Sequence, residues 1–121
     1  MGRQYDKQHA ATVVATAAIE KARFVGFGGA HATAAGGTSA DSMGVSEHAA
    51  AIGSTLSVIT GYSALVEASA PIAAHAFVKP AADGSGKAAV GSNTDHCGKA
   101  LEAATAAGQM IEVVLYRHLH A

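Results

Sequence analysis

Histidine is the residue type with the most chemical potential in this sequence of 121 residues, which contains seven of them. His118 and His120 are two residues apart, so on a strand both side chains would point to one face and share a metal ion. A metal site needs three or four ligands, however, and no partner pair is evident elsewhere in the chain. The sequence therefore predicts no metal site. The other histidines fall in predicted turns or loops, where exposed imidazoles are ordinary; they are His9, His31, His48, His75 and His96.

Nucleophilic and acid–base catalysis lack a local signature as well. The single cysteine, Cys97, stands beside a predicted strand, where a small buried hydrophobic residue is more common than a nucleophile. Neither a Gly-x-Ser-x-Gly elbow nor a His-Glu-x-x-His helix occurs. Glu67, Glu102 and Glu112 are expected to face solvent from predicted strands. We predict that the chain is not an enzyme, with no catalytic residues and no cofactor.

Two glycine-rich segments resemble nucleotide-binding loops but lack required residues. The Gly-Ser-Gly-Lys segment at 84–87 has Ala81 where a phosphate loop needs its first glycine, and Ala88 where it needs Ser or Thr. Segment 26–29 lacks the third glycine and the following helix of a dinucleotide fingerprint. The Asp-Gly-Ser-Gly segment at 83–86 is instead typical of a hairpin turn, because glycine supplies the positive φ that tight turns require.

The composition excludes some partners and favours others. Charged residues make up 14% of the chain, the formal net charge is −1, and the Lys and Arg residues are scattered singly, which argues against a nucleic-acid-binding face. No run of 18 apolar residues occurs, so no membrane span or secretion signal is predicted. Much of the 50% hydrophobic content is alanine, which contributes little free energy when buried. We expect a fold that depends on neighbours, as a homo-oligomer, a lattice component or both.

An internal duplication organises the chain when residues 13–60 are laid over residues 66–115. The register drifts farther along, which predicts two single-residue insertions in loops. We predict an N-terminal arm at 1–11 and one β domain at 12–121, built from two similar units related by a pseudo-twofold axis. The identical pairs that share one spacing are Val13/Val66, Ala15/Ala68, Ala17/Ala70, Ile19/Ile72, Phe24/Phe77 and Val25/Val78.

The predicted fold class is all-β, a small β-sandwich or barrel, because short β-branched and aromatic stretches are bounded by turn residues. The alanine-rich segments 47–52 and 101–107 are too short for stable helices and are expected to form turns or one-turn helices. Segment 28–42 has the composition of a flexible linker, either mobile or ordered by a neighbour. Strand 110–116 is expected to be buried on both faces. The predicted strands are 12–17, 23–27, 43–46, 56–62, 64–68, 76–79, 87–90, 97–103 and 110–116.

The pattern of small and β-branched residues resembles the capsid decoration (cement) proteins of tailed bacteriophages. The resemblance runs through most of the chain and implies a β-rich homotrimer or homodimer, made in the bacterial cytoplasm, that binds the outside of an assembled shell. Its partner would be the major capsid protein, whose subunit contacts it would reinforce. The segments that carry the resemblance are Ile-Glu-Lys-Ala-Arg-Phe-Val-Gly-Phe at 19–27, Met-Gly-Val at 43–45, Ala-Leu-Val-Glu-Ala at 64–68, residues 72–79 and residues 98–115.

Contacts with such a neighbour are expected at the two ends of the chain and in loop 28–42. Aromatic and arginine side chains are the usual anchors of interfaces. The candidate contact residues are Arg3, Tyr5, Tyr116, Arg117 and His118. Two alternatives remain open: another virion component, such as a head fibre base, a tail protein or a spike-associated protein, and a small β-barrel that binds a metal or ligand through its histidines.

Overall fold

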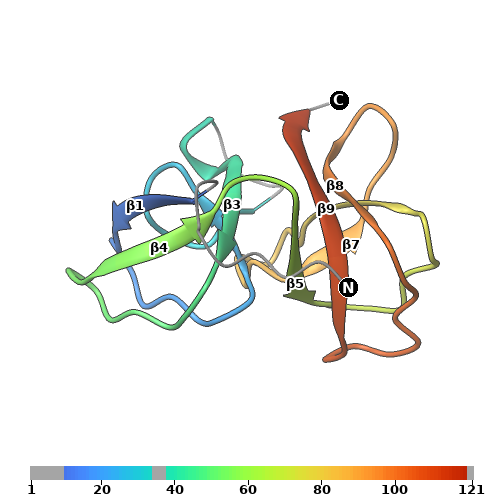
Figure 1. Ribbon diagram of the computed structural model, residues 1–121, viewed down its shortest axis with the longest axis horizontal. Helices are drawn as coiled ribbons and strands as arrows, with labels where there is room; N and C mark the ends of the chain where they lie inside the picture. Colours follow the sequence, from blue (N-terminus) through green and yellow to red (C-terminus); the bar gives the residue numbers. More distant parts are fainter. Residues whose placement is uncertain (1–9, 34–37, 120–121) are drawn as a thin grey trace.

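The computed structural model describes residues 10–33 and 38–119. These residues form nine β-strands and one short 3₁₀ helix, η1, with no α-helix among them, so the predicted all-β class is confirmed (Figure 1). The elements are β1 (Ala10–Val14), β2 (Phe24–Gly26), η1 (Thr38–Ala40), β3 (Ser42–Ser46), β4 (Thr55–Ile59), β5 (Ser63–Glu67), β6 (Phe77–Pro80), β7 (Ala88–Val90), β8 (His96–Ala100) and β9 (Met110–Leu119).

The strands form two antiparallel sheets that lie side by side (Figure 1). One has four strands in the order β1-β4-β3-β2, and the other has five in the order β5-β9-β8-β6-β7. Strands that the sequence repeat equates, such as β1 with β5 and β4 with β9, occupy equivalent places in the two sheets. The isolated bridges Ile19–Ala50 and Ile72–Ala104 are equivalent as well. This agreement is what two copies of one unit would produce.

The halves differ in the length of two loops. Val25 forms a bridge with His31 in the first half, whereas its equivalent Val78 pairs with Val90 across a much longer hairpin, β6–β7. The first half has instead the longer connection into β3, which carries η1. The first drift in register therefore combines two opposite length changes, and the prediction of a single inserted residue there is wrong.

Two hydrophobic clusters form the core. The smaller belongs to the first half alone and is built on Ile19, Leu56 and Val58. The larger contains the equivalent residues of the second half, together with Phe24 and Val45 from β2 and β3 of the first. Strand β5 alternates between core and surface, because Ala64 and Val66 are buried and Leu65 is exposed, whereas β2 is buried along its whole length. The two sheets therefore share one core at their junction.

Glycine at position 44 allows β3 and β4 to lie close together. A Cβ atom there would overlap the carbonyl oxygen of Ile59, so no other residue fits without moving the strand. The equivalent Gly98 in β8 lies against Val113 and Val114 of β9 in the same way.

Most local predictions agree with the structure, to within a few residues at strand ends. Segment 83–86 forms the turn between β6 and β7, with positive φ at Gly84 and Gly86. The expectation that the last strand is buried on both faces is wrong: Ile111 and Val113 face the core, but Tyr116 on the other face is exposed. That face is uncovered because the sheet packs against the first half on one side.

Candidate functional site

A groove of about 480 Å³ lies where the end of β9 meets the start of β3. It brings together the C-terminal strand of the second half and the loop that precedes β3 in the first half. Its lining residues come from both halves of the chain: Phe27, Asp41, Ser42, Met43, Thr60, Leu115, Tyr116, Arg117 and His118.

One wall of the groove is the part of β9 that extends beyond its pairing with β5. Strand β5 pairs with β9 as far as Val114, and the rest of β9 continues against β8, as far as the pair His96–Leu119. The N–H of Ser42, at the start of β3, donates a hydrogen bond of 2.7 Å to Nδ1 of His118. This bond connects the last strand to the first half and fixes the shape of the groove.

Exposed aromatic side chains and an arginine surround the groove. Phe27 is 63% exposed, Tyr116 is 43% exposed, and Arg117 is exposed beside them. The Tyr116 ring stands edge-on to His96, with the ring centroids 5.7 Å apart, and His96 stacks on Phe77 at 4.4 Å. Tyr116 is therefore held in place before any partner binds, which lowers the entropy cost of binding.

The structure brings together three of the five predicted contact residues. Tyr116, Arg117 and His118 line one groove, and residues from the end of the predicted loop 28–42 lie opposite them. Arg3 and Tyr5 lie outside the described residues. The sequence analysis missed Phe27, Met43 and Thr60, which the fold brings to the groove from β-strand ends; an aromatic residue followed by two glycines was the available signal for Phe27.

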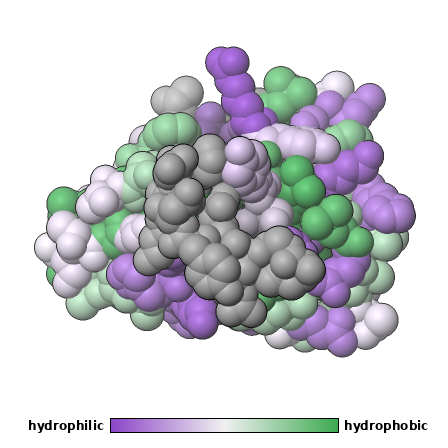
Figure 2. All heavy atoms as spheres, in the orientation of Figure 1, coloured by the Kyte–Doolittle hydropathy of each residue, from purple (hydrophilic) through white to green (hydrophobic). Residues whose placement is uncertain are grey.

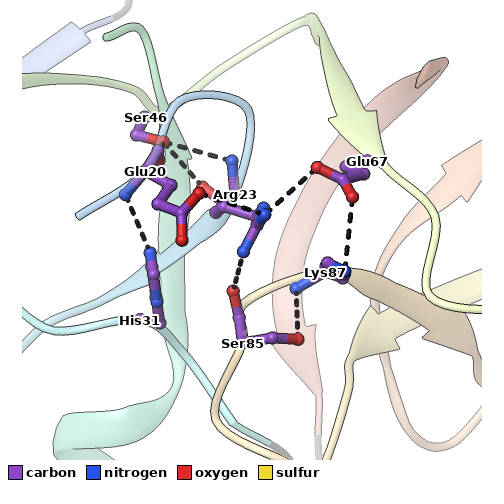
Figure 3. A network of polar contacts seen from close by, with 7 residues as sticks. All are labelled: Glu20, Arg23, His31, Ser46, Glu67, Ser85 and Lys87. Atoms are coloured by element: carbon purple, nitrogen blue, oxygen red, sulfur yellow. Dashed lines mark hydrogen bonds and ion pairs between the residues drawn. The ribbon is translucent and has the colours of Figure 1, made fainter. Parts of the chain in front are cut away.

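A network of polar contacts connects the two halves at the opposite end of β2 (Figure 3). Its centre is Arg23, whose side chain is 9% exposed. The guanidinium donates from Nη1 to the carbonyl oxygen of Ser85 at 2.9 Å and from Nη2 to Glu67 at 3.1 Å, with a longer contact of 3.5 Å to Glu20. Lys87 pairs with the second carboxylate oxygen of Glu67 at 3.3 Å. The Glu67 side chain is 22% exposed and forms ion pairs with Arg23 and Lys87. This contradicts the prediction that Glu67 faces solvent.

Charges in this network shift two pKa values. Burial acts to raise the pKa of Glu67, but hydrogen bonds and charges from Lys87 and Arg23 outweigh it, and the pKa lies below its usual value. His31 accepts a hydrogen bond at Nε2 from the N–H of Glu20. Partial burial and the charge of Arg23 lower the pKa of His31. His31 is therefore not the freely exposed imidazole that the sequence predicted.

Metal binding and thiol chemistry find little support in the part of the chain that the structure describes. Within it, no three His, Cys, Asp or Glu side chains gather where they would hold a metal ion. His120 lies outside that part, so its pairing with His118 stays untested. Cys97 is buried, and burial raises the pKa of its thiol far above the usual range, which disfavours the reactive thiolate. No helix among the described residues is long and apolar enough to span a membrane.

The surface over the two sheets mixes hydrophobic and hydrophilic residues. Figure 2 shows hydrophobic side chains gathered over β8 and β9, with hydrophilic ones around them. Such a surface, with a groove bordered by aromatic residues and an arginine, suits contact with another protein better than binding of a small substrate.

Comparison with known proteins places the fold. Among solved structures, the chain is similar to the crystal structure of the N base of the head fibre protein gp8.5 of bacteriophage phi29. The TM-score is 0.65 at 18% sequence identity, and the match covers 93% of this chain and 97% of that one, which shows a shared fold.

No individual curated protein matches the sequence. The family of phage cement proteins does match, over residues 4–115. Because that match spans nearly the whole sequence, the chain belongs to the phage cement protein family.

Proposed function

We propose that this protein binds the outer surface of an assembled phage capsid and stabilises the contacts between major capsid subunits. The observation that carries the proposal is the groove between β9 and β3, where Phe27, Tyr116 and Arg117 are exposed together. The few residues that dominate binding energy in protein interfaces are enriched in tyrosine, tryptophan and arginine. Membership of the phage cement family makes a capsid the partner that best fits this surface.

Weak individual contacts are sufficient for this role, because a capsid offers many identical sites. A protein that binds the assembled shell and not the free subunits stabilises the shell by mass action. Where neighbouring copies also contact one another, avidity raises the apparent affinity by about 10² to 10⁴. The low charge of the chain suits such contacts, since few ions must be desolvated when the surface is covered.

The direct test mixes the purified protein with expanded shells of its own virus that lack it. We expect saturable co-sedimentation at a fixed ratio to the major capsid protein and a higher melting temperature of the shell. Absence of binding to shells at any concentration would contradict the proposal.

Variants of the groove locate the contact. Replacement of Tyr116 by Ser, or of Arg117 by Ala, is expected to weaken shell binding by about 30-fold, the effect of losing about 2 kcal/mol from an interface anchor. The matched control is Ile52→Ser, because Ile52 is 69% exposed in the turn at the opposite end of β4 from the groove. If the control variant and the groove variants lose affinity equally, the groove is not the contact.

A second candidate function is the base of a head fibre. The likeness to the phi29 head fibre N base, which spans almost all of both chains, favours it. Electron microscopy of virions separates the two functions. Density for this protein that ends at the shell surface supports the cement role, whereas density that continues into a projecting fibre supports the fibre base.

A further inference from the structure

One row of side chains runs across the outer face of the first sheet, the face turned away from the core of that half. The row consists of Phe24, Val45 and Ile59, which are direct neighbours, because Phe24 pairs with Val45 and Val45 pairs with Ile59. Phe24 and Val45 are completely buried. All three side chains pack in or against the larger cluster, together with residues of the second half. The first sheet is therefore covered by protein on both faces.

The second sheet carries the equivalent row in the same register. Phe77 pairs with Lys99, and Lys99 pairs with Val114. These three residues are only half-buried, and none of them belongs to either hydrophobic cluster. A twofold axis between the halves would bury this row against the first half, so the pseudo-twofold axis expected from the sequence is wrong. The same row is thus covered by protein in the first half and uncovered in the second.

The neighbouring row on the same face is apolar only in the second half. Leu65 pairs with Glu112, and the N–H of Leu101 donates to the carbonyl oxygen of Glu112 at 2.9 Å. Leu65 is 55% exposed and Leu101 is 47% exposed. The equivalent positions of the first half hold the polar residues Thr12 and Glu47. Large apolar side chains therefore face outward where the other copy of the unit has polar ones, as expected of a surface that a partner covers.

The outer face of the second sheet also continues into the groove between β9 and β3. The Phe77 ring stacks on His96, and Tyr116, which lines the groove, stands edge-on to His96. We name this face the outer surface, and it consists of Leu65, Phe77, Lys99, Leu101 and Val114.

Lys99 indicates the chemistry of the partner. It stands where the covered row of the first half has Val45, and its ammonium lies 5.1 Å from the centroid of the Phe77 ring. Lys99 forms no ion pair with any residue in the described part of the chain. A partner that covers the row removes water from this ammonium, which is costly unless a carboxylate pairs with it. The outer surface thus fits a partner with apolar side chains and an Asp or Glu residue opposite Lys99.

We propose that the outer surface binds the major capsid protein and that a carboxylate of that protein pairs with Lys99. The inference rests on the proposed function and extends the contact from the groove to the face beside it. A second copy of this chain is a poorer partner, because the surface that covers this row in the first half packs against Val45, an apolar residue.

Substitution of Lys99 tests the charge by the sign of its effect. With expanded shells that lack the protein, Lys99→Met should weaken binding by about 10-fold or more, because it leaves the carboxylate of the partner buried without a counterion. Lys99→Glu should weaken binding further. A contact that is only apolar predicts the opposite, since methionine is easier to desolvate than lysine. Unchanged or tighter binding by Lys99→Met would overturn the proposal.

Equivalent positions in the two halves supply a matched pair of variants. Leu65→Glu should weaken shell binding by about 30-fold, the effect expected at an interface anchor. Thr12→Glu, at the equivalent position of the first half, should bind as the unmodified protein does. Both positions are exposed, so both variants are expected to fold, which thermal unfolding checks. Equal loss of affinity in the two variants would refute the assignment of this face.

Carbodiimide coupling identifies the partner, because it joins an ammonium and a carboxylate that are already in contact. On saturated shells we expect an amide bond between Lys99 and an Asp or Glu residue of the major capsid protein, detected by mass spectrometry after digestion. A bond from Lys99 only to another copy of this chain would overturn the proposal. Failure of the unmodified protein to bind shells would contradict the proposed function and this inference with it, whereas shell binding that is insensitive to Lys99 and Leu65 would remove this inference alone.

Discussion

Replacement of Arg23 by methionine is expected to destabilise the protein strongly, because Arg23 is the centre of the contact between the two halves. Its side chain is 9% exposed and bonds the carbonyl of Ser85 and the carboxylate of Glu67, both in the second half. Methionine keeps the packing of the stem but removes every charged hydrogen bond. The variant leaves the Ser85 carbonyl and one Glu67 oxygen without these donors.

The magnitude follows from how much of the network survives. Removal of one member of a buried ion pair costs about 3–5 kcal/mol. Glu67 is 22% exposed and keeps Lys87 at 3.3 Å, which reduces the cost. We therefore expect a loss of about 3 kcal/mol in the free energy of unfolding, or roughly 10 °C in melting temperature for a chain of this size.

Urea denaturation followed by circular dichroism measures this loss. The midpoint should fall while the slope of the transition stays the same, because the unfolded surface is unchanged. Lys87→Met is the matched control and should cost less than about 1 kcal/mol, since Lys87 is 30% exposed. Addition of Glu67→Leu to the Arg23→Met variant should recover part of the loss by removing the unmatched charge. A loss below about 1 kcal/mol for Arg23→Met would refute the reasoning.

Three further predictions concern the same junction. In urea denaturation, Gly86→Ala should lower the free energy of unfolding by at least about 2 kcal/mol more than Gly84→Ala. Both glycines have positive φ, but a Cβ atom at position 86 would lie 2.7 Å from the carbonyl oxygen of Phe24. A Cβ atom at position 84 would face open space. In the same assay, Phe24→Ala should lower the free energy of unfolding by about 3–5 kcal/mol. Phe77→Ala should lower it much less, because Phe77 occupies the equivalent position but is partly exposed. His31→Gln should reduce the loss of stability on acidification. Because the folded pKa of His31 lies below the usual 6.5, the unfolded chain binds more protons, and stability falls as the pH drops below about 6.5. Urea denaturation at pH 7 and pH 5 gives the difference for each protein, and an equal difference in the variant and the unmodified protein would contradict this role of His31.

The positions of the strands along the chain were largely predictable because the sequence repeats itself, whereas their order in the sheets was not. Short β-branched stretches indicated nine strands, and equivalents such as Ile19 and Ile72 indicated that the halves would have similar cores. The way in which the halves meet was not predictable. It depends on the β6–β7 hairpin, which is longer than its equivalent in the first half. The longer loop before β3 nearly compensates for this extra length, so the aligned halves show only a small drift in register.

The candidate site was predictable in its residue types and not in its position. Tyr116 and Arg117 were chosen because aromatic and arginine side chains anchor interfaces, and both line the groove. Phe27 lies beside them only because β2 ends next to the last part of β9. No local sequence pattern predicts that these two segments are close. The role of Arg23 was hidden for the same reason: the sequence shows it only as a single arginine at the start of predicted strand 23–27, and its burial arises from contacts with Glu67 and Ser85.

The core of the first half shows why the two units depend on each other. Its own cluster is small and is built on Ile19, Leu56 and Val58. Its fully buried aromatic side chain, Phe24, packs in the larger cluster with residues of the second half instead. An isolated first half would expose Phe24 and leave Arg23 without Glu67 and Ser85, losses of several kcal/mol in a unit with little stability to spare. The second half differs because Phe77 stays partly exposed in the folded chain. The same position is thus completely buried in one copy of the unit and only half-buried in the other.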